Sequence, residues 1–396
     1  MSDALPPPVP QQPPRPPPAP PKTSSSSLWL IGCGGLSLLA LVIGVVALAA
    51  AGSASVSDGA VLKMKLGGEI PEYVATEGLD ELFGPKVVTV QQHVFNLKKA
   101  AADKRIKGVL LELEPLMVGP AKVEELRDAL TEFKKSGKFV IAWSEFMTER
   151  EYSLAIAADS IVMPKDSRFE FNGFATDLAH YPGLLEKLGV EVQYFRFGKY
   201  KSGSGEQLGR KAFTEPVKEM ISGNLARGFD HFVSAVAKAR SLEPDTVRAL
   251  VEEAGEKSDW ALEKKLIDKL AYWDEVEAEL RQKTGLKDDE KVKFLPAAKY
   301  RRVSGKDAGL PEGKHTFALI YSVGLIVAGK GGTDPFSGGA SQGADPIIKS
   351  LRKAVEDDDV KAIIFRVDSP AARASAATTC AARSRRRARR SPSSSR

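Results

Sequence analysis

Two stretches of the chain share one pattern and decide the fold. Residues 97–114 read LKKAAADKRIKGVLLELE, and residues 351–368 read LRKAVEDDDVKAIIFRVD, at a constant offset of 254 residues. In both copies a helical period is followed by a charged turn and then by a run of branched apolar residues. Such a run is typical of a strand that is buried on both faces. The chain is therefore predicted to be a tandem duplication of one α/β unit.

The segments around the first copy continue the alternation. Strands are predicted at AVLKMKLGG, KFVIAWS, SIVMP and VEVQYFRFG, and helices at VQQHVFNLKKAAADKR, AKVEELRDALTEFKKSG and REYSLAIAAD. Strands that alternate with helices predict a parallel sheet with crossover helices. The predicted domains are a first repeat with a helical extension at 60–285, a linker at 286–314 and the start of a second repeat at 315–370.

The N-terminal region predicts a membrane anchor. Residues 1–27 are rich in proline and serine and are expected to form a disordered cytoplasmic tail. Residues 28–51 are uncharged, and as a helix they would extend about 36 Å, enough to cross a hydrocarbon core of about 30 Å. The alternative, a lipoprotein cleavage box at LIGC, would require the apolar run to precede Cys33. Arg15 and Lys22 favour a cytoplasmic N-terminus, with the rest periplasmic or extracytoplasmic in the bacterial inner membrane.

The charge of the chain is concentrated at its C-terminal end. The formal net charge is +6, but residues 371–396 contain eight arginines and no acidic residue, so the remainder is nearly neutral. No aromatic or fold signal accompanies this arginine run, and nucleic-acid binding is not expected. The two cysteines form no CxxC motif, and the four histidines form no HxxxH or HExxH motif. We therefore expect no metal and no cofactor.

One loop has the composition of a catalytic site. The sequence YFRFGKYKSGSGEQ, residues 194–207, places Lys199 and Lys201 after a predicted strand and beside aromatic residues. Loss of hydration lowers the pKa of a lysine, and a neutral amine is a general base that activates a serine without histidine. The alternative is that both lysines are solvated loop residues. Ser202 and Ser204 are poor nucleophile candidates, because Ser/Gly loops are commonly linkers.

These features together resemble the long, two-repeat form of the bacterial signal peptide peptidase (SppA) family, serine peptidases of the ClpP/crotonase superfamily. The N-terminal anchor, IKGVLLELE, KSGKFVIAWSE, FNGFAT, FRFGKYKSG and the opening of a second repeat all match, over roughly residues 60–370. The resemblance implies a Ser–Lys dyad that cleaves residual signal peptides in the membrane. It places the general base at Lys201, in a YKS motif, and implies a homo-oligomeric ring around the active sites.

The chain departs from the family where the nucleophile belongs. The resemblance predicts Ser-Pro-Gly-Gly-Ser after the second-repeat strand, and this chain has Ser369, Pro370, Ala371, Ala372 and Arg373 instead. Removing one G from the codons CCG GGC GGC TCG GGC gives Pro-Ala-Ala-Arg-Ala, the sequence found here. We therefore interpret residues 371–396 as an out-of-frame basic tail that truncates the second repeat; a genuine basic tail is the alternative.

The sequence thus favours a serine endopeptidase of the signal peptide peptidase type whose present product lacks the nucleophile and is inactive alone. Its expected partners are the lipid bilayer and extended peptides, including signal peptides. A second hypothesis is a non-enzymatic, membrane-tethered ClpP-like scaffold that binds peptides or other subunits. A third, an acyl-CoA enzyme related to crotonase, fits the superfold but neither the anchor nor the lysine motif.

Overall fold

The computed structural model describes residues 55–74, 87–333 and 340–371, all within one compact unit, Ser53–Arg396. The strands are β1 (Ala60–Gly68), β2 (Ile106–Leu116), β3 (Phe139–Trp143), β4 (Phe146–Met147), β5 (Ser160–Met163), β6 (Arg168–Phe171), β7 (Gly255–Lys257), β8 (Lys269–Leu270), β9 (Phe294–Pro296), β10 (Thr316–Val323), β11 (Leu325–Val327), β12 (Gly331–Thr333), β13 (Ala340–Gly343) and β14 (Val360–Asp368). The helices are α3 (Val90–Ala102), α4 (Pro120–Lys134), α5 (Glu149–Ala155), α6 (Pro182–Lys187), α7 (Gly203–Gly209), α8 (Glu215–Arg240), α9 (Pro244–Glu253), α10 (Ser258–Glu263), α11 (Trp273–Thr284), α12 (Ala297–Tyr300) and α13 (Ala344–Glu356).

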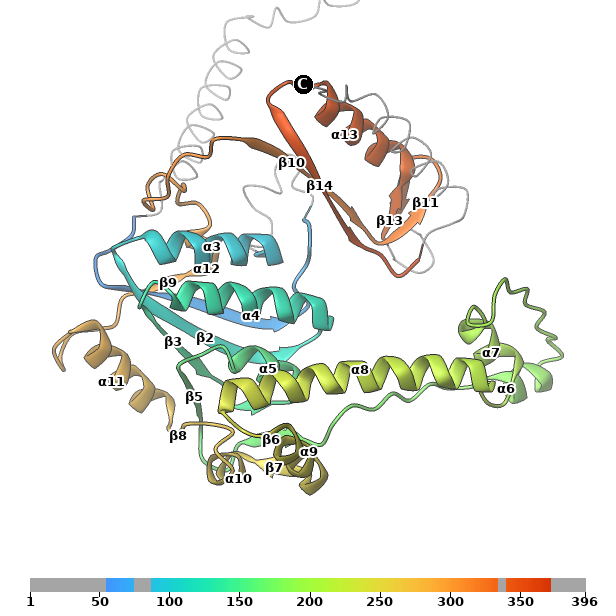
Figure 1. Cartoon of the computed structure of the whole chain (residues 1–396), viewed down its shortest axis with the longest axis horizontal. Helices are drawn as coiled ribbons and strands as arrows, with labels where there is room; N and C mark the ends of the chain where they lie inside the picture. The colour runs from blue at the N-terminus through green and yellow to red at the C-terminus, as the bar shows by residue number, and fades with distance from the viewer. Residues whose placement is uncertain (1–54, 75–86, 334–339, 372–396) are drawn as a thin grey trace, which may run out of the picture. The chain divides into compact units, whose positions relative to one another are not determined.

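A parallel six-stranded sheet forms the centre of the first α/β segment (Figure 1). Its strand order is β8-β5-β3-β2-β1-β9, and every neighbouring pair is parallel. Helices α3 and α4 form the crossovers between its central strands, as the alternating sequence predicts. A smaller sheet of β4, β6 and β7 lies beside it. The predicted α/β fold with a parallel sheet is therefore confirmed.

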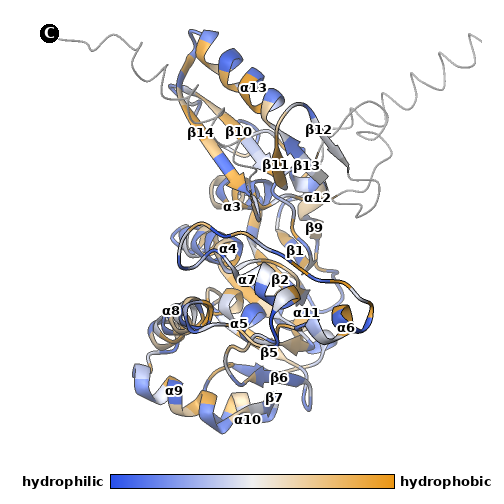
Figure 2. Cartoon of the chain, turned by 90° about the vertical axis from the view of Figure 1, so that its right-hand side faces the viewer, coloured by the Kyte–Doolittle hydropathy of each residue, from blue (hydrophilic) through white to orange (hydrophobic). Residues whose placement is uncertain are grey.

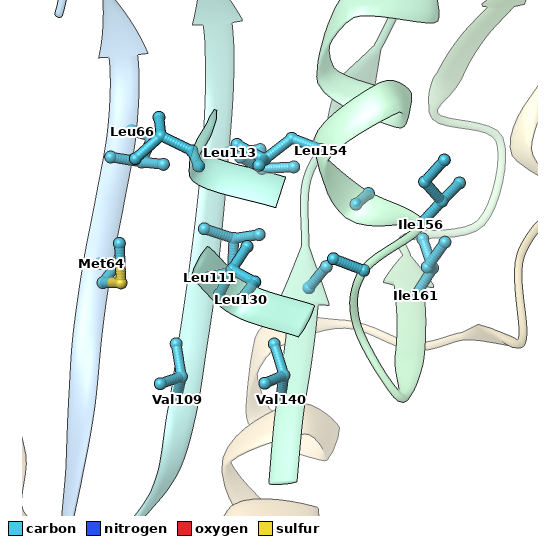
Figure 3. Close-up of a cluster of buried hydrophobic side chains, with 14 of the residues drawn as sticks. Met64, Leu66, Val109, Leu111, Leu113, Leu130, Val140, Leu154, Ile156 and Ile161 are labelled. Carbon is cyan, nitrogen blue, oxygen red and sulfur yellow. The ribbon is translucent and has the colours of Figure 1, made fainter. Parts of the chain in front are cut away.

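Both faces of β2 and β3 are buried, and one face of β1 is buried. Alternate residues of β1 and β2, including Met64, Leu66, Leu111 and Leu113, lie in one large apolar cluster with side chains of α4, β3 and α5 (Figure 3). The residues between them, such as Leu110, lie in a second cluster on the opposite face with Val276 and Leu280 of α11. Burial on two faces accounts for the continuous apolar run in IKGVLLELE.

The second α/β segment repeats the pairing geometry of the first. Strands β10 and β14 are parallel neighbours, as β1 and β2 are. The pair Thr316↔Val360 is followed by a register shift to Phe317↔Ala362, and Ala60↔Ile106 is followed by the same shift to Val61↔Gly108. Helix α13 precedes β14 as α3 precedes β2, at the offset of 254 seen in the sequence.

Two sequence predictions differ from the described structure, and three lie outside it. The segment 286–314, predicted to be a linker, includes β9 and α12, and β9 pairs with β1 because Phe294 and Leu295 supply an apolar edge. The predicted strand at 190–198 is wrong, since these residues form no strand. The predicted tail at 1–27, the predicted membrane span at 28–51 and, apart from Ala371, the predicted basic segment at 371–396 lie outside the described residues. Within the described ranges, no helix has the length and hydropathy needed to cross a bilayer.

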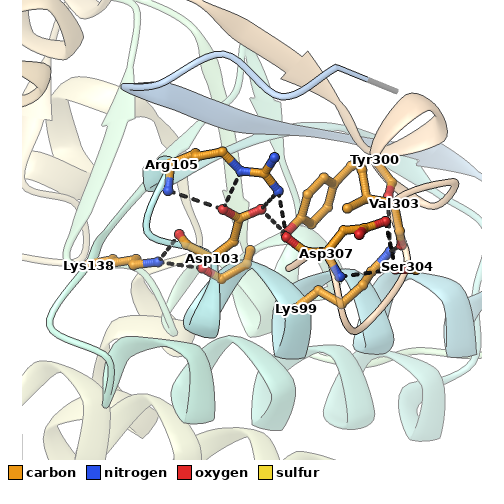
Figure 4. Close-up of polar contacts among 9 residues, drawn as sticks. Lys99, Asp103, Arg105, Lys138, Tyr300, Val303, Ser304 and Asp307 are labelled. Carbon is orange, nitrogen blue, oxygen red and sulfur yellow. Dashed lines mark hydrogen bonds and ion pairs between the residues drawn. The ribbon is translucent and has the colours of Figure 1, made fainter. Parts of the chain in front are cut away.

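A buried lysine fastens α12 to the first segment (Figure 4). Lys99 of α3 is fully buried, and its ammonium donates to the carbonyl oxygens of Tyr300 at 2.9 Å, Val303 at 2.8 Å and Arg301 at 3.4 Å. The Tyr300 hydroxyl donates in turn to Asp103 at 3.1 Å. Desolvation lowers the pKa of Lys99 to about 8, and the nearby Asp103 carboxylate opposes that shift. At neutral pH the ammonium remains the main form, so these are charge-assisted hydrogen bonds.

Candidate active site

Lys201 lies on an arm between β6 and α8. Residues 174–214 leave the small sheet after Phe171, form the short helices α6 and α7 and return at the start of α8, whose N-terminal end they surround (Figure 1). Lys201 is exposed in the loop that leads into α7. Among the described residues, no hydrogen bond or ion pair holds its amine. In the described structure Lys201 therefore has the environment of the alternative interpretation, a solvated loop lysine.

A buried carboxylate fixes the loop that carries Lys201. Glu206 of α7 is almost fully buried and accepts three hydrogen bonds: from the Ser202 hydroxyl at 2.6 Å, and from the Thr214 amide at 2.8 Å and hydroxyl at 2.7 Å. Desolvation works to raise the pKa of Glu206, but these hydrogen bonds outweigh it and the net shift is downward. Ser202 is itself buried, so its hydroxyl anchors the loop next to Lys201 and is not accessible to a peptide.

The neighbouring lysine has a different environment. The Lys199 ammonium donates to Glu219 at 3.0 Å and to the Tyr200 hydroxyl at 3.1 Å. These hydrogen bonds, from Tyr200 first and Glu219 second, raise the pKa of Lys199. A lysine that is held as an ammonium is a poor general base, so the geometry distinguishes Lys199 from Lys201.

Removing the Glu206 carboxylate is expected to free the loop that carries Lys201. In a Glu206→Ala variant, Ser202 and Thr214 lose their shared acceptor, and amide hydrogen exchange in residues 199–205 should rise by about tenfold or more. Glu186→Ala, which removes an exposed carboxylate from α6 of the same arm, is the matched control and should leave this exchange unchanged. Equal exchange in the two variants would show that Glu206 does not order the loop.

A second buried carboxylate, that of Glu149, fixes the residues where the arm leaves the small sheet. Glu149 of α5 accepts hydrogen bonds from the amides of Asn172 and Gly173, both at 2.7 Å. Gly173 has a φ of +91°, a conformation that disfavours side chains, which explains the glycine in FNGFAT. Neither Glu149 nor Glu206 was identified as a site residue from the sequence, because a single acidic residue carries no signal of what it will accept.

The turn that follows β14 is the predicted site of the nucleophile. The Ser369 hydroxyl donates to the Ala371 carbonyl at 2.7 Å, and the Ile326 amide donates to the same oxygen at 3.1 Å. Arg373, at the position where the sequence resemblance predicts a serine, lies outside the described residues. No hydrogen bond or ion pair joins Lys201 to this turn in the described parts of the chain, so the dyad stays a prediction.

The end of β14 is attached to the first segment by an arginine. The Arg366 guanidinium donates to Glu72 at 2.6 and 3.0 Å and to Glu125 at 2.6 and 2.8 Å. The hydrogen bonds with Glu125 and then Glu72 raise its pKa further. Lys122 and Asp368 form an ion pair at 2.8 Å beside it. The strand end that leads into Ser369 is therefore fixed by paired charges.

The first segment has a pocket at the edge of its sheet that corresponds to the carboxyl end of β14. This pocket, of about 520 Å³, lies at the carboxyl ends of β1, β2 and β3, and its polar side chains come from Glu112, Glu114, Glu145 and Trp143. No hydroxyl, thiol or imidazole side chain is among its lining residues. The lining of this pocket thus includes no nucleophilic side chain.

These observations define an α/β protein with a parallel sheet that carries an exposed lysine on a projecting arm. Residues 132–287, which include β3, the arm and α8, match the model of Peptidase family S49. This match and the relatives described next support an SppA-type peptidase.

The relatives support this placement. The chain is 33% identical over 316 residues to the chloroplastic serine protease SPPA of Arabidopsis thaliana, covering 80% of this chain and 45% of the relative. It is 29% identical over 307 residues to Protease 4 of Salmonella typhi, covering 73% and 47%. A putative signal peptide peptidase SppA of Enterococcus faecium is 25% identical over 239 residues, covering 60% and 67%. The chain spans less than half the length of the first two relatives.

Among solved structures, a membrane-bound stomatin-specific protease overlaps with 61% of this chain and 98% of its own, with a TM-score of 0.34 and 10% sequence identity.

Proposed function

We propose that this chain is built as a serine endopeptidase with Lys201 as its general base, acting on residual signal peptides and other extended peptides. The observation that carries the proposal is the position of Lys201 within the family-matched residues 132–287. There its amine is exposed and unpaired among the described residues, while Ser202 and Glu206 fix the loop beside it. An exposed amine on an ordered loop is available to a hydroxyl that another part of the protein presents.

The proposed reaction needs one further group. A neutral Lys201 amine accepts the proton of a serine hydroxyl as its oxygen attacks the peptide carbonyl, and the resulting ammonium protonates the leaving amine. Water then hydrolyses the acyl-enzyme. At the position expected for the serine this chain has Arg373, whose guanidinium remains charged and does not act as a nucleophile. We therefore expect the chain by itself to be inactive.

We also propose that the chain contains a tandem repeat, a membrane anchor and a surface for assembly into an oligomer. The shared pairing register of β1–β2 and β10–β14 supports a tandem repeat of the ClpP/crotonase type. The uncharged run at 28–51 supports a single membrane span with the peptidase region outside the cytoplasm. Phe195 and Phe197 on the arm are each 92% exposed, and paired exposed aromatic side chains support burial against another subunit of a homo-oligomeric ring.

The second candidate function is a membrane-tethered scaffold without catalytic activity. The observation in its favour is the same exposed aromatic surface of the arm, which suits binding of peptides or other subunits whether or not a nucleophile is present.

Labelling with a fluorophosphonate separates the two functions. We expect the chain as it stands to remain unlabelled, because it has no activated serine. A protein whose reading frame is restored after Pro370 should be labelled at the serine that replaces Arg373, with one label per chain. An unlabelled restored protein that still binds peptide would favour the scaffold. Labelling of the present chain would refute the assignment of the nucleophile.

A further inference from the structure

Strand β14 has an apolar surface that the described part of the protein leaves uncovered. Its only neighbour among the described strands is β10. Ile364 is 51% exposed, Phe365 44% and Val367 54%. The strand is coloured as hydrophobic over much of its length in Figure 2. Three large apolar side chains on one exposed strand, beside a row of backbone amides and carbonyls that no described strand pairs, form a template for a further strand.

The first segment shows what covers this surface when the unit is complete. At the offset of 254, Ile364, Phe365 and Val367 correspond to Leu110, Leu111 and Leu113 of β2. Those three leucines are at most 2% exposed. Strands β2 and β14 both have large apolar residues at these positions, so the difference in burial comes from the elements that pack beside each strand.

In the first segment, the strand that covers β2 is β3. Strand β3 pairs with β2 in parallel, on the side away from β1, with Gly108 opposite Phe139 and Glu112 opposite Trp143. Ile141 and Val140 of β3 lie in the two apolar clusters that bury the β2 leucines. The corresponding side of β14 is the one opposite β10, from Ala362 to Arg366.

The residues that follow β14 in this chain have the wrong composition for that strand. Residues 371–396 contain no valine, isoleucine, leucine, methionine or aromatic residue, and the positions equivalent to the start of β3, 393–396, read SSSR. Residues 371–396 therefore lack the apolar run with which β3 covers β2.

We propose that the free edge of β14 is a binding site for an extended apolar peptide, which adds as a parallel strand opposite Ala362–Arg366 in the register that β3 adopts on β2. Backbone hydrogen bonds to the unpaired edge supply the affinity, and alternating side chains of the peptide cover the exposed apolar residues. The chemistry that fits is a run of about five branched or aromatic residues, as in Phe139–Trp143. The site is separate from Lys201 and requires no catalytic activity.

The test uses the full chain and a fluorescent peptide with the sequence of residues 138–145, KFVIAWSE. We expect saturable binding in fluorescence anisotropy and slower hydrogen exchange of alternate amides in Ala362–Arg366. The same peptide with Ile141→Pro lacks an amide donor in the middle of the strand and should bind at least about tenfold more weakly. Equal binding of the two peptides, or exchange protection elsewhere, would overturn the proposal.

Two protein variants test the location of the site. Ile364→Asp places a charge on the exposed face of β14 and should weaken binding by at least about tenfold. Val355→Asp is the matched control, since Val355 is also an exposed apolar residue but belongs to helix α13 and not to the strand, and this variant should bind as the parent does. Concentration-dependent dimerisation that protects β14 without peptide would assign the edge to a second copy of the chain and refute a peptide site.

Discussion

In the protein with its reading frame restored after Pro370, Lys201→Ala is expected to lower kcat for peptide cleavage by about 10²- to 10⁴-fold. The amine is the proposed proton acceptor, and no histidine is present in the motif to replace it. The Michaelis constant should change little, because Lys201 is assigned to proton transfer and not to substrate binding. Steady-state cleavage of a fluorogenic peptide, together with fluorophosphonate labelling of the serine, measures the effect.

Lys199→Ala is the matched control for this prediction. It removes an ammonium two residues away whose partners, Glu219 and Tyr200, are also exposed. Exposed ion pairs contribute little to stability, so this variant should retain kcat to within about twofold. If both variants lost activity equally, the loop and not the base would be the cause. Full turnover in Lys201→Ala would remove this residue from the mechanism.

The pattern of apolar residues in the sequence was sufficient to predict the strands of the central sheet, and the reason is physical. Strands β2 and β3 are buried on both faces, so they need continuous apolar runs. Helices α3 and α4 each expose one face, and the resulting period of 3.6 identifies them. The same logic misses β9, since three residues are too few to show a period.

The arm shows where this logic fails. VEVQYFRFG alternates as a half-buried strand does, yet residues 190–198 are not a strand, and Phe195 and Phe197 are among its most exposed side chains. A strand needs a neighbour, and the alternation of one segment says nothing about whether a neighbour is present. Likewise, the motif identified Lys201, but the Glu206 carboxylate that orders its loop depends on Thr214, eight residues further along the chain. Such a contact becomes visible only after the chain has folded.

Replacing Lys99 by methionine is expected to destabilise the first segment by about 3 kcal/mol, the largest stability effect that we predict. Methionine approximates the length and the apolar stem of the lysine, but it leaves the carbonyls of Tyr300, Arg301 and Val303 without their shared donor. Buried acceptors that lose their partner keep the full cost of desolvation. Urea unfolding followed by tryptophan fluorescence gives the free energy of unfolding. Lys98→Met, which changes the exposed neighbour on α3, should differ from the parent by less than about 0.5 kcal/mol.

The pH dependence of this difference tests the charge on Lys99. Its pKa in the folded protein is about 8, below the value of about 10.4 in an unfolded chain. Between these values the unfolded chain binds more protons, so the contribution of Lys99 to the free energy of unfolding rises with pH. The stability gap between the parent and Lys99→Met should therefore widen by up to about 3 kcal/mol from pH 8 to above pH 10.4. A gap that stays constant through this window would mean that the three carbonyls hold the ammonium as firmly as water does, because its pKa would then be the same in the folded and unfolded chain.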